Sequence, residues 1–216
     1  MKKKAYVALV VVILVLGVLF IRRANNTNAD NKSKTSSYQA TSEEISEVQG
    51  DLGDSITSCK FYLDGKVYTA PLNVSEFISE GWKFDEAATE SVSSLQPGTR
   101  TNVTFMNKEN ESYSKRMGVS FYNNTEQEVA LEEAPIASLD LSKSAKMKVI
   151  LPKGITWEST MEDAIAAYGD AEDSWTTGDR SHLIYSAKNG EDTININLAF
   201  DKNDEGVSML TGVKFQ

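Results

Sequence analysis

The residue types that could support catalysis are few in this chain. His182 is the single histidine, so a Ser/His/Asp arrangement would need it as the general base. It lies in Arg180-Ser181-His182-Leu183, next to a predicted strand, and no G-x-S-x-G turn occurs anywhere to present a nucleophile. We therefore predict a surface or strand-edge histidine.

Acidic residues are abundant but not arranged for chemistry. Neighbours in sequence such as Glu162 and Asp163 point apart, whereas glycoside hydrolysis needs two acids facing each other across a cleft. Residues 201–206 resemble the start of a calcium loop, but Gly212 stands where a bidentate Glu is required. This stretch predicts a hairpin turn, with weak cation binding left open. No catalytic, cofactor-binding or metal-binding residues are predicted.

Aromatic residues are the better candidates for recognition. Trp82 and Trp157 flank two predicted helices and are expected in the core. Trp175 lies in the polar stretch 172–180 and is the candidate exposed aromatic, with burial against the next strand as the alternative. Trp175 and Tyr185, on that next strand, are the predicted partner-binding residues.

An apolar segment near the amino end predicts where these residues act. Residues 5–21 contain no charged side chain and lie between three lysines and two arginines. Such a helix would be about 25 Å long, which suits a membrane anchor over 1–23. The heavier positive side precedes the span, so the C-terminal part is expected outside the cytoplasm. A removed signal, cut after Ala29 to give a secreted protein, is the alternative.

Net charge limits the partners. Removing residues 1–23 takes away five of the 22 basic residues and none of the 31 acidic ones, which leaves a charge of −14. A surface of that sign argues against nucleic acid as a partner. The lone Cys59 excludes an intramolecular disulfide and is expected to be a small buried side chain.

Composition divides the rest of the chain. Residues 24–42 are rich in Asn, Ser, Thr and Lys, and we predict a disordered linker over 24–48. Strict alternation over residues 193–200 and 207–215 predicts half-buried strands. Asn189-Gly190 and Asp64-Gly65 predict hairpin turns.

Two helices interrupt the strands. One is expected over residues 73–81 after an Asn73 cap, and the other after a Ser159/Glu162 capping box. Each follows a proline and precedes alternating strands, which is a weak internal duplication. The predicted fold class is α+β: units at 49–144 and 145–216, each with a short helix packed on an antiparallel sheet. An α+β fold without duplication is the alternative.

Short motifs in both halves resemble a known exported module. The second half carries Leu151-Pro152-Lys153-Gly154-Ile155-Thr156, then Asp163-Ala164-Ile165 and Tyr168-Gly169-Asp170; the first half carries Phe61, Asp64-Gly65, Tyr68, Pro71 and Gly81-Trp82. These motifs are similar to the small outer-membrane-lipoprotein family and the β-lactamase-inhibitor-protein fold, and resemble uncharacterised membrane-attached proteins of Gram-positive bacteria. The chain lacks the paired cysteines of the inhibitors and the lipid-bearing cysteine of the lipoproteins.

The resemblance implies a protein-binding or scaffold module. We therefore expect a membrane-anchored extracytoplasmic interaction module, held through residues 5–21, whose partner is a protein or an envelope component. A cell-envelope hydrolase or carbohydrate-binding protein is the alternative. A hydrolase would bring carboxylates such as Asp163, Asp170 and Asp179 together with His182.

Overall fold

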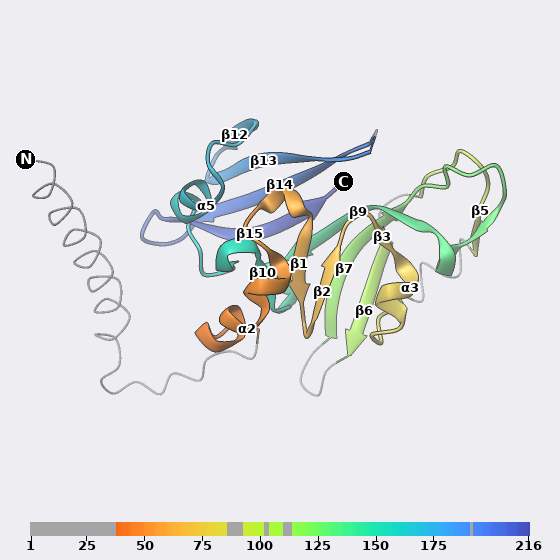
Figure 1. Cartoon of the computed structure of the whole chain (residues 1–216), viewed down its shortest axis with the longest axis horizontal. Coiled ribbons are helices and arrows are strands. Elements are labelled where there is room, and N and C mark those ends of the chain that lie inside the picture. The colour runs from red at the N-terminus through yellow and green to blue at the C-terminus, as the bar shows by residue number, and fades with distance from the viewer. Residues whose placement is uncertain (1–37, 86–92, 102–103, 110–113, 191) are drawn as a thin grey trace, which may run out of the picture. The chain divides into compact units, whose positions relative to one another are not determined.

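A large antiparallel sheet organises the molecule (Figure 1). The structure, a computed structural model, describes residues 38–85, 93–101, 104–109, 114–190 and 192–216. The sheet has nine strands in the order β12-β13-β14-β15-β9-β7-β6-β4, with β3 also pairing with β9. They are β12 (Asp173–Thr177), β13 (Arg180–Asn189), β14 (Asp192–Lys202), β15 (Ser208–Phe215), β9 (Pro135–Ser142), β7 (Ser114–Phe121), β6 (Thr104–Glu109), β4 (Lys83–Phe84) and β3 (Leu72–Asn73).

Smaller elements pack beside this sheet. A four-stranded sheet has the order β11-β10-β1-β2, and two short strands form a third sheet. These strands are β11 (Ile155–Thr156), β10 (Val149–Leu151), β1 (Lys60–Leu63), β2 (Lys66–Thr69), β5 (Ser94–Leu95) and β8 (Val129–Ala130). The helices among the described residues are α2 (Ser42–Leu52), α3 (Val74–Ile78) and α5 (Met161–Tyr168), with 3-10 turns η1 (Ile56–Ser58), η2 (Leu131–Glu133), η3 (Lys143–Ala145) and η4 (Pro152–Gly154). The predicted α+β class is confirmed.

A chain of aromatic rings joins the small sheet to the large one. Phe61 on β1 stacks on Phe215 of β15, with ring centroids 4.6 Å apart. Phe61 also contacts Tyr68 on β2, and Tyr68 in turn stacks on Phe77 of α3 at 4.5 Å. All four rings are buried. Burial of side chains this large is a main source of stability, so these rings fix the small sheet and α3 to the large sheet.

The predicted core residues lie where expected. Trp82 and Trp157 are both buried, and the Trp157 Nε1–H donates to the Met147 carbonyl at 2.6 Å. Cys59 is also buried, and this burial raises the pKa of its thiol. The structure confirms these three predictions.

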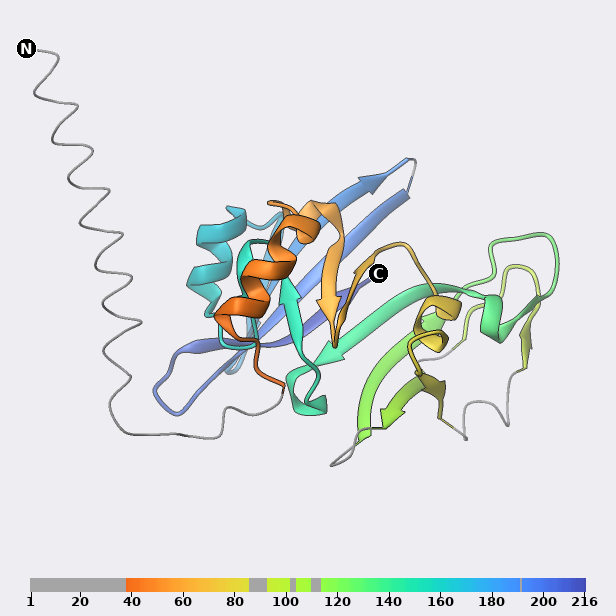
Figure 2. The same ribbon diagram turned by 60° about the horizontal axis from the view of Figure 1, so that its bottom comes forward.

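The same order of elements occurs twice along the chain. A strand hairpin (β1–β2 or β10–β11) precedes a helix (α3 or α5), and strands of the large sheet follow. The last strand of each half, β9 or β15, pairs with the other near the centre of the large sheet, and β1 pairs with β10 at the centre of the small sheet. Figure 2 shows α5 near the β12–β15 end and α3 near β6 and β7.

Each half also has a register shift in the ladder that its last strand forms with the other strand of the same half. The β7–β9 ladder shifts between Ser120 and Phe121, and the β14–β15 ladder shifts between Ala199 and Phe200. Residues Ser37–Gln216 form one compact unit, and the boundary predicted between 144 and 145 lies within η3. The two predicted units therefore share both main sheets.

The linker predicted over residues 24–48 ends earlier than expected, because residues 42–48 belong to α2. The Thr41 N–H donates to Glu44 Oε2 at 2.8 Å, and the Glu44 N–H donates to Thr41 Oγ1 at 3.2 Å. This reciprocal cap offsets the unpaired donors of the first turn. At its other end the helix buries Leu52 completely. The polar composition concealed this cap.

The cap of α5 is one residue later than predicted. Thr160 is the N-cap and Asp163 its partner, because the Ser159 hydroxyl accepts instead from the Thr156 N–H at 3.0 Å. The cap predicted at Asn73 is confirmed, although α3 ends at Ile78. In the described residues no helix is long and apolar enough to cross a membrane. The anchor predicted over 1–23, with its apolar segment 5–21, and the linker up to residue 37 lie outside them.

Candidate functional site

One face of the large sheet is only partly covered. Along β13 the side chains of Leu183, Tyr185 and Ala187 are buried, and the alternate ones are half-buried. The buried set faces α5, because the Tyr185 hydroxyl donates to the Gly169 carbonyl at the end of that helix. His182 and Ile184 therefore point to the opposite, open face.

A shallow hollow of about 340 Å³ lies on this open face. We call it, together with the adjoining Trp175, the Trp175 shelf. Small residues form its floor, since Ala199 lies opposite Gly212 where β14 pairs with β15. Polar side chains surround this floor. They are Asp140, Ser142, Arg180, His182, Asn197, Thr211 and Lys214.

Trp175 is held in place by an unusual ring contact. It lies opposite His182 in the β12–β13 ladder, and the two rings stack with centroids 4.5 Å apart and planes 12° apart. The His182 Nδ1 is 2.9 Å from Asn197 Oδ1 on the next strand, which fixes the imidazole plane. Trp175 nevertheless remains 41% exposed. The indole is thus exposed and oriented before any partner arrives.

A second group of side chains borders the shelf. Arg180 binds Asp201 through two nitrogens, at 3.0 and 3.1 Å, and Thr211 Oγ1–H donates to the same carboxylate at 2.7 Å. Bidentate pairing gives this group a defined geometry although it is exposed. It therefore presents fixed polar atoms beside the aromatic ring.

Asp140 and Lys214 lie opposite each other across the β9–β15 pair. Partial burial among the strands raises the pKa of Asp140, and the positive charges of Lys214 and Arg180 lower it by a smaller amount. Asp140 therefore gains a proton at a higher pH than an ordinary aspartate does.

The outer edge of β12 is partly blocked against further strands. The Ser174 N–H donates to Asp173 Oδ1 at 2.8 Å, so one edge donor is already used. Natural sheets protect their edges in such ways. Recognition by β12 therefore depends on its side chains, and Trp175 is the largest of these.

The structure does not bring the two predicted partner-binding residues together. Tyr185 is 4% exposed and packs its ring edge-on against Tyr168, with centroids 5.6 Å apart. Burial raises the pKa of both phenols. Tyr185 is thus a core residue on the face away from Trp175.

The groups considered for catalysis lie in separate places. Asp163 caps α5, Asp179 lies in the β12–β13 turn beside Lys202, and His182 stacks on Trp175. Asp170 lines a different hollow, next to Tyr185. Among the residues that the structure describes, no three His, Cys, Asp or Glu side chains gather as metal ligands would.

The calcium-like stretch forms the predicted hairpin. Residues 201 and 202 end β14, and Asn203 Oδ1 accepts from the N–H groups of Glu205 and Val207 at 3.0 and 2.9 Å. The asparagine oxygen is thus used to build the turn.

Sequence reasoning missed Asn197 and the Arg180–Asp201–Thr211 group. A signal for the Arg180–Asp201 pair was present. Asn189 pairs with Asp192 at the hairpin turn, and Arg180 and Asp201 lie equally far from that pair on the two strands, so the ladder places them opposite each other. Thr211 could not be found in this way, since the shift at Ala199/Phe200 changes the register of the next ladder.

Comparisons with known proteins give no relative for this chain: no family model, curated protein or solved structure matches it.

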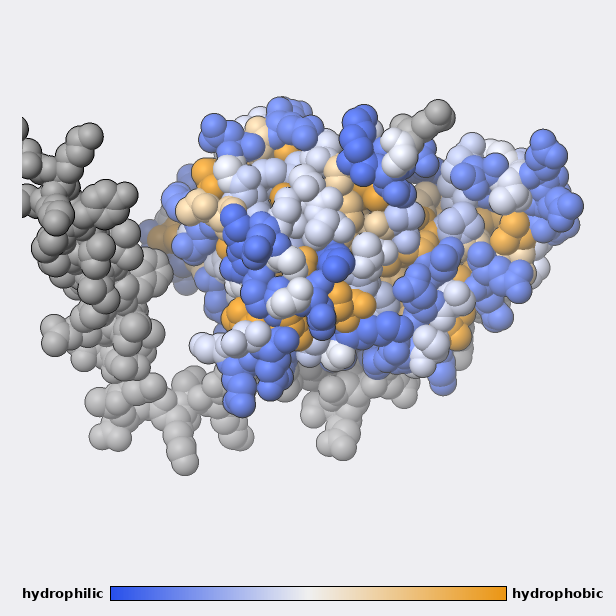
Figure 3. All heavy atoms as spheres, viewed as in Figure 1, coloured by the Kyte–Doolittle hydropathy of each residue, from blue (hydrophilic) through white to orange (hydrophobic). Residues whose placement is uncertain are grey.

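The face in Figure 3 carries small separate apolar groups among hydrophilic residues.

Proposed function

We propose that this protein is a membrane-anchored extracytoplasmic interaction module that binds a protein or envelope component through the Trp175 shelf. The observation that carries the proposal is the exposed Trp175, stacked on His182 and fixed through Asn197. Tryptophan is enriched among the residues that dominate binding energy, and a rigid ring loses little entropy on association.

The chain architecture supports the same proposal. Residues 5–21 would hold the protein in the membrane, and the following linker, which ends before α2, would set its reach. The matched element order and register shifts favour two duplicated α+β units, each contributing a helix and half of the large sheet. A broad sheet built in this way presents an open face suited to recognition.

A carbohydrate of the envelope is the second candidate partner. Arg180, Asp201 and Asn197 place hydrogen-bonding groups beside an exposed aromatic ring, and an apolar ring face flanked by a few fixed polar groups is a general design for small-molecule sites.

Binding of the full chain in detergent to isolated envelope material tests the proposal. Trp175→Ala should weaken binding by about thirtyfold, the loss expected for an interface hot spot. Ile78→Ala, which removes a comparably exposed apolar side chain on α3, serves as the matched control and should bind as the native chain does. Protease treatment of the envelope material removes binding if the partner is a protein, and glycan digestion removes it if the partner is a carbohydrate. Equal binding by Trp175→Ala and the native chain would reject the shelf as the site.

A further inference from the structure

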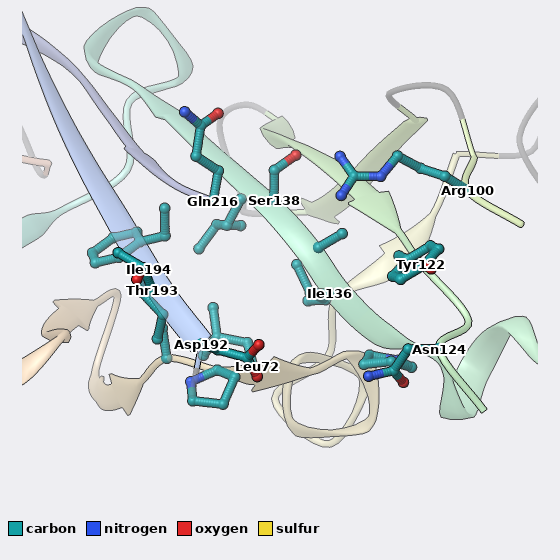
Figure 4. Close-up of a pocket in the computed structure, with 16 residues that line it drawn as sticks. Leu72, Arg100, Tyr122, Asn124, Ile136, Ser138, Asp192, Thr193, Ile194 and Gln216 are labelled. Carbon is teal, nitrogen blue, oxygen red and sulfur yellow. The ribbon is translucent and has the colours of Figure 1, made fainter. Parts of the chain in front are cut away.

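A second hollow, of about 320 Å³, lies where the two halves of the large sheet diverge (Figure 4). It opens beyond the end of β15, between the first residues of β14 on one side and β3 and β9 on the other. Leu72, Ile136 and Ile194 supply an apolar floor. This hollow shares no lining residue with that of the Trp175 shelf, and we call it the β14 groove.

The β14 groove is bordered by a strand edge that lacks a neighbour among the described residues. Asn195 and Gln216 exchange backbone hydrogen bonds of 2.7 and 3.0 Å, and the β14–β15 pairing ends there. Residues Asp192, Thr193 and Ile194 continue β14 and pair with β13 on the other side only. Backbone donors and acceptors at such an edge can receive an added strand.

A cation faces the groove from its far side. Arg100 lies over the Tyr122 ring, 5.7 Å from its centroid, and Figure 4 shows the guanidinium directed toward Ser138 across β9. Arg100 forms no ion pair with the described residues, and Tyr122 is 40% exposed. An arginine supported by an aromatic ring is well placed to bind a carboxylate.

We propose that the β14 groove binds an extended peptide that adds as a strand to residues 192–194, with apolar side chains on the floor and a carboxylate side chain on Arg100. The alternation of side chains in a strand makes these demands compatible, since every second residue faces the floor and the others face Arg100. Strand addition supplies affinity through the backbone, and the floor and Arg100 supply the choice of sequence. Asp192, at the opposite end of the groove, disfavours a second acidic residue there.

The probe is the hexapeptide Val-Thr-Val-Glu-Val-Thr, with fluorescein on its amino end and an amide at its carboxyl end, and the protein is the full chain in detergent. Fluorescence polarisation should show saturable binding. Replacing Glu in the peptide by Lys, or Arg100 by Gln in the protein, should weaken it about tenfold, because each change removes a charge-assisted hydrogen bond.

A backbone test separates strand addition from adhesion to an apolar surface. Two N-methylated peptides are compared, one methylated on the odd-numbered amides and one on the even-numbered amides. One of them should lose binding and the other should bind unchanged, because only one of these two sets of amides faces β14. Hydrogen exchange at Thr193 should slow when the peptide is bound, because its N–H faces the same edge as that of Asn195, which is already bonded to Gln216.

Matched variants make the outcome decisive. Arg180→Gln, which alters the Trp175 shelf, and Trp175→Ala should both leave peptide binding unchanged, so failure of the proposed function would not affect this result. The inference is overturned if there is no saturable binding up to about 1 mM, or if the Glu and Lys peptides bind with equal affinity. It is also overturned if neither N-methylated peptide loses binding, or if Arg100→Gln and Arg180→Gln have equal effects.

Discussion

Asn73 and Thr160 hold equivalent positions in the two halves of the molecule. Each is the N-cap residue of a helix, α3 or α5, and each pairs with the last strand of its own half, Asn73 with Pro135 and Thr160 with Met209. In each half, the start of the helix is therefore fixed to the large sheet through the last strand of that half. These contacts make the caps part of the tertiary structure.

The Thr160 cap should be measurable as stability. Its hydroxyl accepts from the Asp163 N–H at 3.1 Å, and its N–H donates to Asp163 Oδ2 at 2.9 Å. Thr160→Ala leaves the Asp163 N–H without its acceptor and should lower the free energy of unfolding by about 1 kcal/mol. Urea unfolding measures this difference. Thr160→Ser keeps the hydroxyl and should restore most of the loss; a serine variant as unstable as the alanine variant would argue against the cap.

The attachment of α2 should depend on pH. The Lys148 side chain and the Thr41 N–H both hydrogen-bond Glu44 and lower its pKa. Because the folded pKa is below the unfolded value of about 4.3, the stabilisation is present at neutral pH and is lost as the pH falls through the folded pKa. Glu44→Gln should therefore be less stable than the native chain at pH 7, by about 0.5 kcal/mol, and this difference should shrink as the pH falls through the folded pKa of Glu44.

Glu47, exposed on the same helix, provides the control for that prediction. Glu47→Gln should be as stable as the native chain at pH 7, because Lys148 pairs with Glu44. If both variants behave alike in urea unfolding at each pH, the Glu44–Lys148 pair is not what attaches α2.

The tryptophans should differ sharply in their contribution to stability. Trp157→Phe removes the Nε1–H bond to the buried Met147 carbonyl and leaves a gap, at a cost of about 2–4 kcal/mol. Trp175→Phe alters an exposed ring and should change the unfolding free energy by less than about 0.5 kcal/mol. Thermal or urea unfolding of the pair measures this, and similar losses would place Trp175 in the core after all.

Gly154 should tolerate no side chain. Its φ of +76° is unfavourable for other residues, and an added Cβ would lie 2.9 Å from Ile45 Cγ2 on α2. Gly190, with φ +63° and open space around it, isolates the conformational part. Gly190→Ala should cost about 1 kcal/mol, and Gly154→Ala distinctly more because the Ile45 side chain on α2 must also move. Equal losses in urea unfolding would show that α2 does not press on this turn.

The sequence predicted the fold class and several positions correctly because their signals are local. Alternation along residues 193–200 identified a strand, Gly190 marked a turn, and the positions of Trp82 and Trp157 beside predicted helices indicated burial. The helix at Ser42–Leu52 was missed, since its cap lies in a polar stretch and its stability comes partly from Lys148, far away in sequence.

The candidate site shows the same division. The polar neighbours of Trp175 left exposure and burial as alternatives, and the structure shows exposure; its stacking on His182 depends on the pairing of β12 with β13. Tyr185 was assigned to a partner-binding role although its position in β13 puts it on the core side. Long-range register decided both outcomes, and no local pattern encodes it completely.

Site-specific photo-cross-linking on cells that carry the full chain tests the central claim most directly. A benzophenone side chain at Ile184, on the open face beside Asn197, should give one discrete adduct that disappears in the Trp175→Ala background. The same group at Glu162, exposed on α5, should give no such adduct. An adduct at Ile184 that persists without Trp175, or no adduct at all, would contradict recognition through the Trp175 shelf.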